Sequence, residues 1–464
     1  MITRALRGSV ILRSLARFLR LSLAQARQSA LFGLLRGSFV LGFACARLPA
    51  VFSLVTAALF VIPGPVFDNL YSLYAMTALT ALALLGGYFT PAANSRGINK
   101  PRFSAIGGSG IYALLFLAVV LFSVVASPLP LVSFRSLLFL LTAFMACALA
   151  YFVLRSRRDL RLFVVILLAA VTVSGLYACY QAYVGLDVSS RQTDLSQNPD
   201  MPGRVYSFFT NPNNYAMMLV MVLPLYAAVF FESKSGLARR AAALCFLPPA
   251  LALLLTFSRA GWASFAVGVL VFLFFTHRRV IPYLFAAALI TLPLLPSSIH
   301  TRLFSLFGIF TSSDSSASHR AYIYNLVFPV LEKHWLFGTG LGTESLRYAI
   351  MRYYATLPEF TSFEWGVPPH THNIYLQVWL ETGIAGVASF CGAAAALLRR
   401  CADTLRRRRD YMLTAGFACI VSSLFFGFFD YIWFYPRTML LFWLVTGVTL
   451  RALRPDEAQA ANSA

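Results

Sequence analysis

Apolar runs of about 17 to 25 residues recur along the chain and are separated by mostly short polar links. The hydrocarbon core of a bilayer is about 30 Å thick, so a spanning helix needs roughly 20 apolar residues. The 464 residues are 59% hydrophobic and only 12% charged, about half the charged fraction of a soluble domain. The sequence therefore predicts an all-α, polytopic transmembrane helix bundle.

Twelve spans are predicted, with a long polar segment between the ninth and the tenth. They lie near residues 48–62, 70–90, 110–126, 133–154, 162–184, 206–230, 238–256, 260–276, 280–296, 373–398, 411–428 and 433–452. The predicted parts are a basic segment (1–47), helices one to nine (48–296), a large extracytoplasmic loop (297–371), helices ten to twelve (372–452) and a tail (453–464).

The distribution of Lys and Arg predicts the orientation of the bundle. With the N-terminus inside, the cytoplasmic segments hold 28 of the 38 Lys and Arg residues, but only six of the 17 acidic ones. Residues 1–47 carry eight arginines and read as a basic amphipathic helix on the inner membrane surface. A thirteenth span near 30–46 would move this cluster outside, which argues against it. We therefore predict a multi-pass membrane protein with both termini cytoplasmic.

The same distribution argues against nucleic acid as a partner. The net charge of +21 gathers on the inner side, where it matches an anionic lipid leaflet. The seven cysteines lie in or beside apolar runs, so a disulfide framework is not expected. No cleavable signal peptide is apparent. Membrane lipids are the partner that the charge pattern favours.

One arginine interrupts a long apolar run, in LALLLTFSRAGWASF. Arg259 is the only charged residue between Ala241 and Phe275. A helix of 35 residues would be about 52 Å long, much longer than the bilayer is thick. Cytoplasmic markers, Arg239–Arg240 and Arg278–Arg279, flank the run at both ends. The run must therefore go out and return, which puts Ser258 and Arg259 near an outer tip. An arginine snorkelling to lipid headgroups is the simpler alternative.

Two further arginines lie in predicted outer loops. Arg204 shortly precedes Asn211-Pro212, a helix start in which Asn caps and Pro opens the helix. Free N–H groups at such a start favour anions, although an ordinary capped helix would look the same. Arg320 lies in the long loop, whose many aromatic residues favour an ordered structure. The GTGLG turn of that loop lacks the Gly-Lys-Ser/Thr ending of a nucleotide-binding loop.

The long loop closes with PPHTHN, which places His370 and His372 at the outer mouth of the next helix. Two histidines at i and i+2 do not share a helix face, and the sequence offers no third ligand, so neither a metal nor a cofactor is predicted. A neutral histidine with a pKa near 6.5 suits a general base, although a hydrogen-bonded structural histidine is the alternative. Arginines beside it are matched to diphosphate oxygens.

Several short motifs, in this order, resemble the O-antigen ligase and polymerase superfamily of bacterial membrane glycosyltransferases. They span roughly residues 200–390 and are individually weak. The motifs are Gly203-Arg204 with Asn211 and Asn214, Thr256–Ala260, Arg320, Leu336–Gly342, His372–Gln377 and Glu381–Gly386.

The resemblance implies a metal-independent, inverting transfer of a glycan from an undecaprenyl-diphosphate carrier to a hydroxyl of a glycan or lipid acceptor. Arg204 and Arg259, with Arg320, would bind the diphosphate. His372 would activate or orient the acceptor, and it is preferred to His370 because it directly precedes Asn373, as in the family motif. The residues expected to support the site are His370, Asn373, Asn211 and Ser258.

Ligases and polymerases of this superfamily use the same donor, so the sequence leaves both open. A transporter of lipid-linked sugars is the alternative from another class. It would be expected to show an internal repeat and broken helices at mid-membrane depth. The sequence shows no repeat, and its candidate polar residues cluster at one face. A scaffold protein would leave the outer arginines unexplained.

Overall fold

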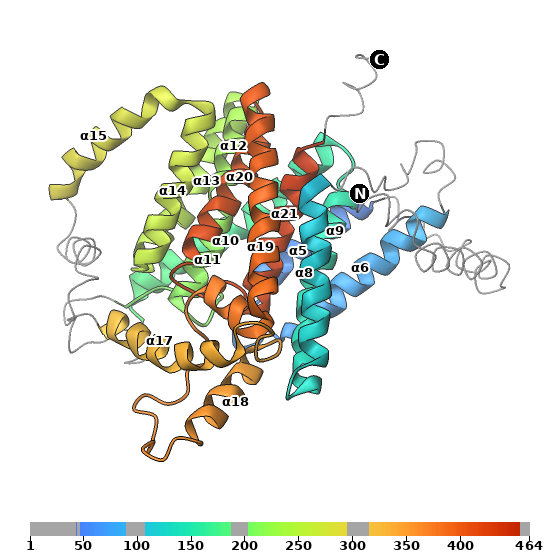
Figure 1. The fold of residues 1–464 in the computed structure, drawn as a ribbon. Coiled ribbons are helices and arrows are strands. Elements are labelled where there is room, and N and C mark those ends of the chain that lie inside the picture. Colours follow the sequence, from blue (N-terminus) through green and yellow to red (C-terminus); the bar gives the residue numbers. More distant parts are fainter. Residues whose placement is uncertain (1–42, 44–46, 90–106, 187–202, 295–314, 455–464) are drawn as a thin grey trace.

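The computed structural model describes residue 43 and residues 47–89, 107–186, 203–294 and 315–454 (Figure 1). Within these ranges the chain is helical and contains no strand. The first nine helices are α5 (Leu48–Val61), α6 (Asn69–Phe89), α8 (Gly107–Val125), α9 (Pro130–Val153), α10 (Arg157–Val184), α11 (Pro212–Val222), α12 (Pro224–Glu232), α13 (Gly236–Leu255) and α14 (Arg259–Thr276). The rest are η2 (Arg278–Val280), α15 (Ile281–Thr291), η3 (Leu292–Leu294), α17 (Ser315–His334), α18 (Thr343–Tyr354), α19 (Ile374–Arg407), α20 (Tyr411–Phe426) and α21 (Pro436–Ala452).

Six helical segments are long and apolar enough to cross a membrane: α9, α10, the α11–α12 pair, α13, α14 and α19. Shorter apolar helices lie within α5, α6, α8 and α20. Each predicted span contains a helix, but several ends differ. The predicted span at 206–230 begins only at Pro212 and is divided at Pro224, because proline cannot continue the backbone ladder. Most of the predicted N-terminal amphipathic segment and of the C-terminal tail lies outside the described residues.

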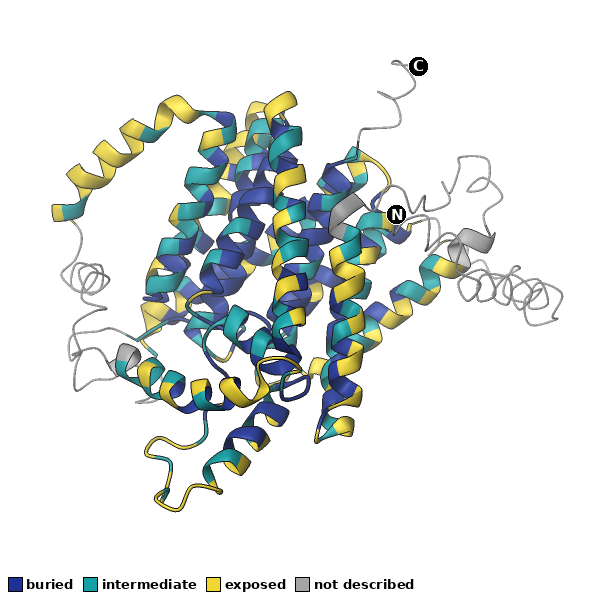
Figure 2. Cartoon of the chain, in the orientation of Figure 1, coloured by how far each residue is buried: buried dark blue, intermediate teal, exposed yellow. Residues whose placement is uncertain are grey.

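The α11–α12 pair is the centre of the bundle. Almost every residue of α11 is buried, including Tyr215, and a helix that is apolar all round belongs inside a protein. Around it, α9 packs against α21, α8 against α19, and α14 against α20. The buried residues therefore concentrate along the bundle axis, and the yellow, exposed positions lie on its rim (Figure 2).

Two helices of the predicted long loop lie across one end of the bundle (Figure 1). α17 buries Ile323, Val327 and Val330 in a small core that it shares with Leu346 of α18 and Leu380 of α19. The 297–314 part of this loop lies outside the described residues. The described part of this segment thus contains two packed helices, whereas residues 355–371 between α18 and α19 form no helix.

The opposite end of the bundle is tied together by arginines. α19 runs from the α17–α18 end to this one, and Arg408 just after it lies 3.3 Å from the carboxylate of Asp410. Arg157 at the start of α10 also pairs with Asp410. Arg239 donates to the carbonyl of Ser233 at 2.9 Å. These ion pairs and carbonyl contacts hold the ends of α10, α12, α13, α19 and α20 together.

α15 differs from the other predicted spans because none of its residues is buried. It extends away from the bundle after η2 (Figures 1 and 2). The apolar side chains of α15 are therefore not buried by the rest of the described structure.

Candidate active site at the start of α19

The chain enters α19 through a turn, residues 370–373, that hydrogen bonds hold in place. Asn373 caps the helix by accepting two backbone N–H groups of the first turn, and its Nδ2 donates to the carbonyl of Phe428 at 3.3 Å. His372 has φ +50°, in the left-handed region that non-glycine residues rarely occupy. Such a conformation costs on the order of 1–3 kcal/mol, so the surrounding bonds must fix it.

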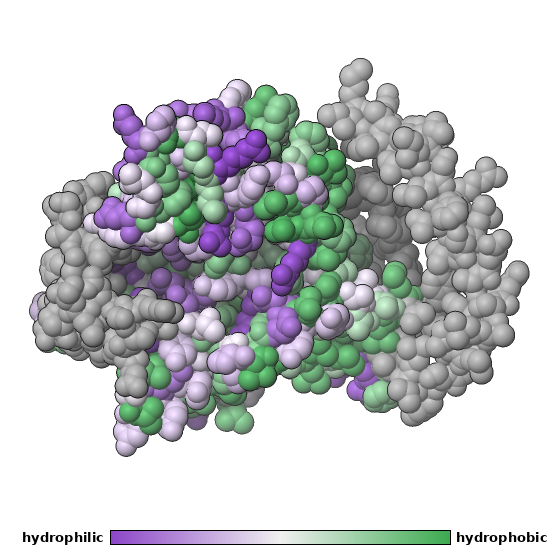
Figure 3. Space-filling view, turned by 90° about the horizontal axis from the view of Figure 1, so that it is seen from below, coloured by the Kyte–Doolittle hydropathy of each residue, from purple (hydrophilic) through white to green (hydrophobic). Residues whose placement is uncertain are grey.

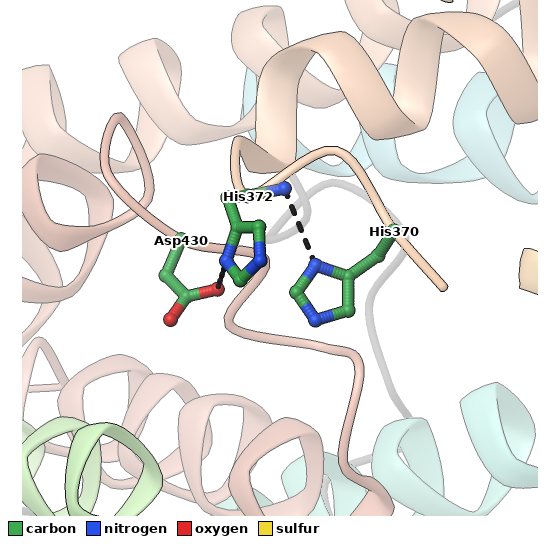
Figure 4. A group of neighbouring side chains, drawn as sticks. All are labelled: His370, His372 and Asp430. Carbon is green, nitrogen blue, oxygen red and sulfur yellow. Dashed lines mark hydrogen bonds and ion pairs between the residues drawn. The ribbon is translucent and has the colours of Figure 1, made fainter. Parts of the chain in front are cut away.

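The imidazole of His372 faces the carboxylate of Asp430, in the loop between α20 and α21 (Figure 4). His372 Nδ1 lies 2.9 Å from Asp430 Oδ1, which also accepts the N–H of Tyr431 at 2.8 Å. Burial raises the pKa of Asp430, but the charge and hydrogen bond of His372, with His370 and Arg320, outweigh it and lower the pKa to about 2. The ionised carboxylate can only accept, so Nδ1 of His372 carries hydrogen, and its Nε2 can take up a proton when the ring is neutral.

His370 supports the backbone of His372. Its buried ring lies 4.2 Å from the His372 ring and from that of Phe434, and its Nδ1 accepts the backbone N–H of His372 at 3.2 Å. Burial, followed by the charges of His372 and His319, lowers the pKa of His370 to about 4 although Asp430 opposes this. The ring is therefore neutral near pH 7. Of the two histidines, His372 has the carboxylate partner and the greater exposure.

α17 brings His319 and Arg320 to the same place. The ring of His319 lies 6.3 Å from that of His372 and 5.4 Å from that of Trp365. Burial and the positive charges of His372 and Arg320 lower the pKa of His319. Arg320 also contributes to the low pKa of Asp430. The structure thus brings together three of the candidate residues selected from the sequence: Arg320, His370 and His372.

Two histidines and one acid at this place could also hold a metal ion. The potential ligand atoms of His370, His372 and Asp430 lie within 4.8 Å of one another. The sequence offered no third ligand, and Asp430 supplies one. However, His372 Nδ1 is already bonded to Asp430, and His370 Nδ1 to the His372 N–H. These bonds satisfy the buried groups without an ion, so the geometry does not require one.

A second polar corner lies where α13 ends and α14 begins. Ser258 caps α14 by accepting the N–H of Gly261, and Arg259 is the first residue of that helix. Arg204 reaches this turn, since its Nε donates to the carbonyl of Thr256 at 2.8 Å. The structure therefore confirms that the long apolar run is interrupted at Ser258–Arg259, and it places Arg204 at the same corner.

The start of α11 contacts both the arginine corner and the start of α21. Asn211 caps this helix, as predicted, and Asn213 within it accepts a hydrogen bond from Arg204 Nη2 at 2.7 Å. One residue further, the side chain of Asn214 is hydrogen bonded to Tyr435, five residues after Asp430. Viewed from the α17–α18 end, hydrophilic residues gather around a hollow in this face (Figure 3).

Sequence reasoning missed Asp430 and His319. Asp430 is the only acidic residue between Asp410 and Asp456, at the turn between the last two apolar runs. That isolation is a usable signal, because acids inside or beside membrane spans are rare and mark function. His319 carried no comparable signal, since it precedes Arg320 in an ordinary polar stretch.

Residues 241–391 match the family model described as O-antigen ligase, Wzy_C. The match contains Ser258, Arg259, Arg320 and the 370–373 turn, whereas Arg204 and Asp430 lie outside it. No curated protein matches the chain. The chain thus contains an O-antigen ligase domain at residues 241–391, which supports its relation to the O-antigen ligase superfamily.

Proposed function

We propose that this protein transfers a glycan from an undecaprenyl-diphosphate carrier to an acceptor hydroxyl at the outer face of the bacterial plasma membrane. The observation that carries the proposal is the His372–Asp430 pair, with the base inside the O-antigen ligase domain. The bundle end with this pair lies opposite the arginine-rich end, which the charge rule assigns to the cytoplasm.

The proposed reaction is a single displacement with inversion. The acceptor oxygen attacks the anomeric carbon while Nε2 of His372 takes its proton, and the bond from that carbon to the diphosphate oxygen breaks. The electron pair leaves with the diphosphate. Asp430 stabilises the imidazolium that forms, and a positioned base of this kind contributes about 10²- to 10⁴-fold in rate.

The arginines are proposed to bind the departing diphosphate. Arg204 and Arg259 share one corner, and Arg320 approaches from α17 beside His372. A guanidinium matches two phosphate oxygens at once and keeps its charge at any physiological pH. Because the negative charge on the leaving oxygen grows in the transition state, these contacts accelerate the step itself. On this proposal the reaction needs no metal.

Transfer from a purified lipid-linked glycan tests this function. His372→Ala and Arg259→Ala are each expected to lose about 10²-fold or more in kcat. Arg399→Ala is the matched control, since that side chain is 86% exposed at the opposite end of α19. Full activity of a correctly folded His372→Ala protein would refute the mechanism. A product ladder would indicate a polymerase, and a single addition to a different acceptor a ligase.

A further inference from the structure

The consecutive helices α13 and α14 do not pair closely with each other. α13 packs mainly against α10, and α14 mainly against α20. Two apolar cavities of about 380 and 650 Å³ lie where the two helices separate, and both are lined by Phe246, Leu247 and Phe265. The two cavities adjoin at these side chains and together form one apolar groove. The α13–α14 groove is defined by Phe246, Leu247, Leu251, Leu254, Trp262 and Phe265.

A proline pair explains why α13 stays close to α10. Pro248 and Pro249 lie inside α13 and leave backbone carbonyls of the preceding turn without their usual donors. Gly175 of α10 packs so tightly on Pro249 that an added Cβ would lie 2.5 Å from its nitrogen. The thiol of Cys179 approaches the carbonyl of Pro248 at 3.8 Å. These contacts hold α13 on α10 and leave space beside α14.

The groove extends to the end of α13, which leads into the arginine corner. Trp262 lines the groove, and its Nε1 donates to the carbonyl of Leu253 at 3.0 Å, which joins the two helices at this end. The residues that follow α13 form the Thr256–Arg259 turn, and Arg204 donates a hydrogen bond to the carbonyl of Thr256 in this turn. An apolar chain lying in the groove would therefore present its polar head to Arg204 and Arg259.

We propose that the α13–α14 groove binds the polyisoprenoid chain of the donor lipid and delivers its diphosphate to the arginine corner. This inference rests on the proposed function. A diphosphate head matches two neighbouring guanidinium groups better than a zwitterionic phospholipid head does. The bilayer is already apolar, so burial in the groove adds little hydrophobic free energy. The groove therefore acts by packing and orientation, and its effect on KM is expected to be moderate.

Two alanines allow the groove to be filled. Ala266 on α14 lines the cavity nearer the arginines, and Ala243 on α13 lines the other one; both are exposed. Ala266→Phe and Ala243→Phe are expected to raise KM about tenfold for a glycan on a long polyprenyl diphosphate. The same glycan on a short, two-isoprene diphosphate should show no change. Ala118→Phe on the exposed face of α8 is the control and should affect neither donor.

A photoreactive polyprenyl diphosphate provides a readout that does not depend on turnover. It is expected to label α13 or α14 in the unmodified protein, and less so in Ala266→Phe. Labelling confined to other helices would refute binding of the polyisoprenoid chain in the groove. An equal KM for the long-chain donor in all folded variants would refute it too, and neither result would contradict the proposed reaction. A rise in KM of equal size with both donors would also overturn it. Absence of transfer by the unmodified protein from the long-chain donor would instead refute the proposed function.

Discussion

His372 is fixed from two sides, by a carboxylate at its ring and by a second histidine at its backbone. The backbone at this residue is left-handed, and its ring faces Asp430 (Figure 4). Two buried titratable groups, with pKa values of about 2 and about 4, therefore keep fixed protonation states around it. The consequences can be tested separately for Asp430 and His370.

Asp430→Asn removes the charge but keeps the size of the side chain. We expect kcat to fall by about 10²-fold or more, because the imidazolium loses its counter-ion and the ring its fixed tautomer. KM should change little, and the pH–rate profile should shift, which a merely structural role would not produce. Asp403→Asn, which alters a half-exposed carboxylate at the far end of α19, is the control. An unchanged pH–rate profile with full kcat would contradict this role.

His370→Asn keeps an acceptor for the His372 N–H but does not titrate. The pKa of His370 is lowered to about 4 in the folded state, against about 6.5 unfolded. Between pH 4 and pH 6.5 the unfolded state therefore binds more protons than the folded state. The contribution of neutral His370 to the free energy of unfolding is complete above pH 6.5 and is lost as the pH falls toward 4. The loss is on the order of 3 kcal/mol. Thermal unfolding between pH 7.5 and 5 should be less pH-dependent in the variant; an identical dependence would contradict the assignment.

At the scale of elements, the sequence predicted local features well. The cap at Asn211 and the turn at Ser258–Arg259 both follow from residues close together in the chain. The His372–Asp430 pair joins residues 58 positions apart, and one sequence does not say which outer turns meet. The α13–α14 separation also depends on how each helix packs with distant partners, and periodicity alone does not encode that.

α19 is kinked at Gly383, whose backbone is not helical, and this kink gives an element-scale prediction. Gly383 has φ +72°, and an added Cβ would lie 2.1 Å from the carbonyl oxygen of Leu336. Gly383→Ala should destabilise the protein by about 2 kcal/mol or more and loosen the α17–α18 region, read by thermal unfolding and limited proteolysis. Gly236→Ala is the matched control, because an added Cβ there meets nothing within 4 Å. Equal stability of the two variants would contradict the packing described here.

For the whole molecule, the two bundle ends carry different sets of polar side chains. One carries the histidine turn and the arginine corner, and the other carries the ion pairs around Asp410. The predicted orientation puts the first end outside, where a lipid-linked donor would be reached after it has crossed the membrane.

Single cysteines in a cysteine-free background test this orientation. Ser362 is exposed between α18 and α19, and Ser235 is exposed between α12 and α13. Ser362→Cys should react with a membrane-impermeant maleimide in intact spheroplasts, whereas Ser235→Cys should react only after permeabilisation. The reverse pattern would overturn the orientation and the location of the proposed reaction.

The division of the site between the matched domain and the last two helices has a consequence for biogenesis. His372 leaves the ribosome well before Asp430, and the acid reaches its position only when α20 and α21 have been inserted. A nascent or C-terminally truncated chain therefore contains His372 without Asp430. If the proposed mechanism holds, transfer therefore requires the insertion of α20 and α21 as well as of the matched domain.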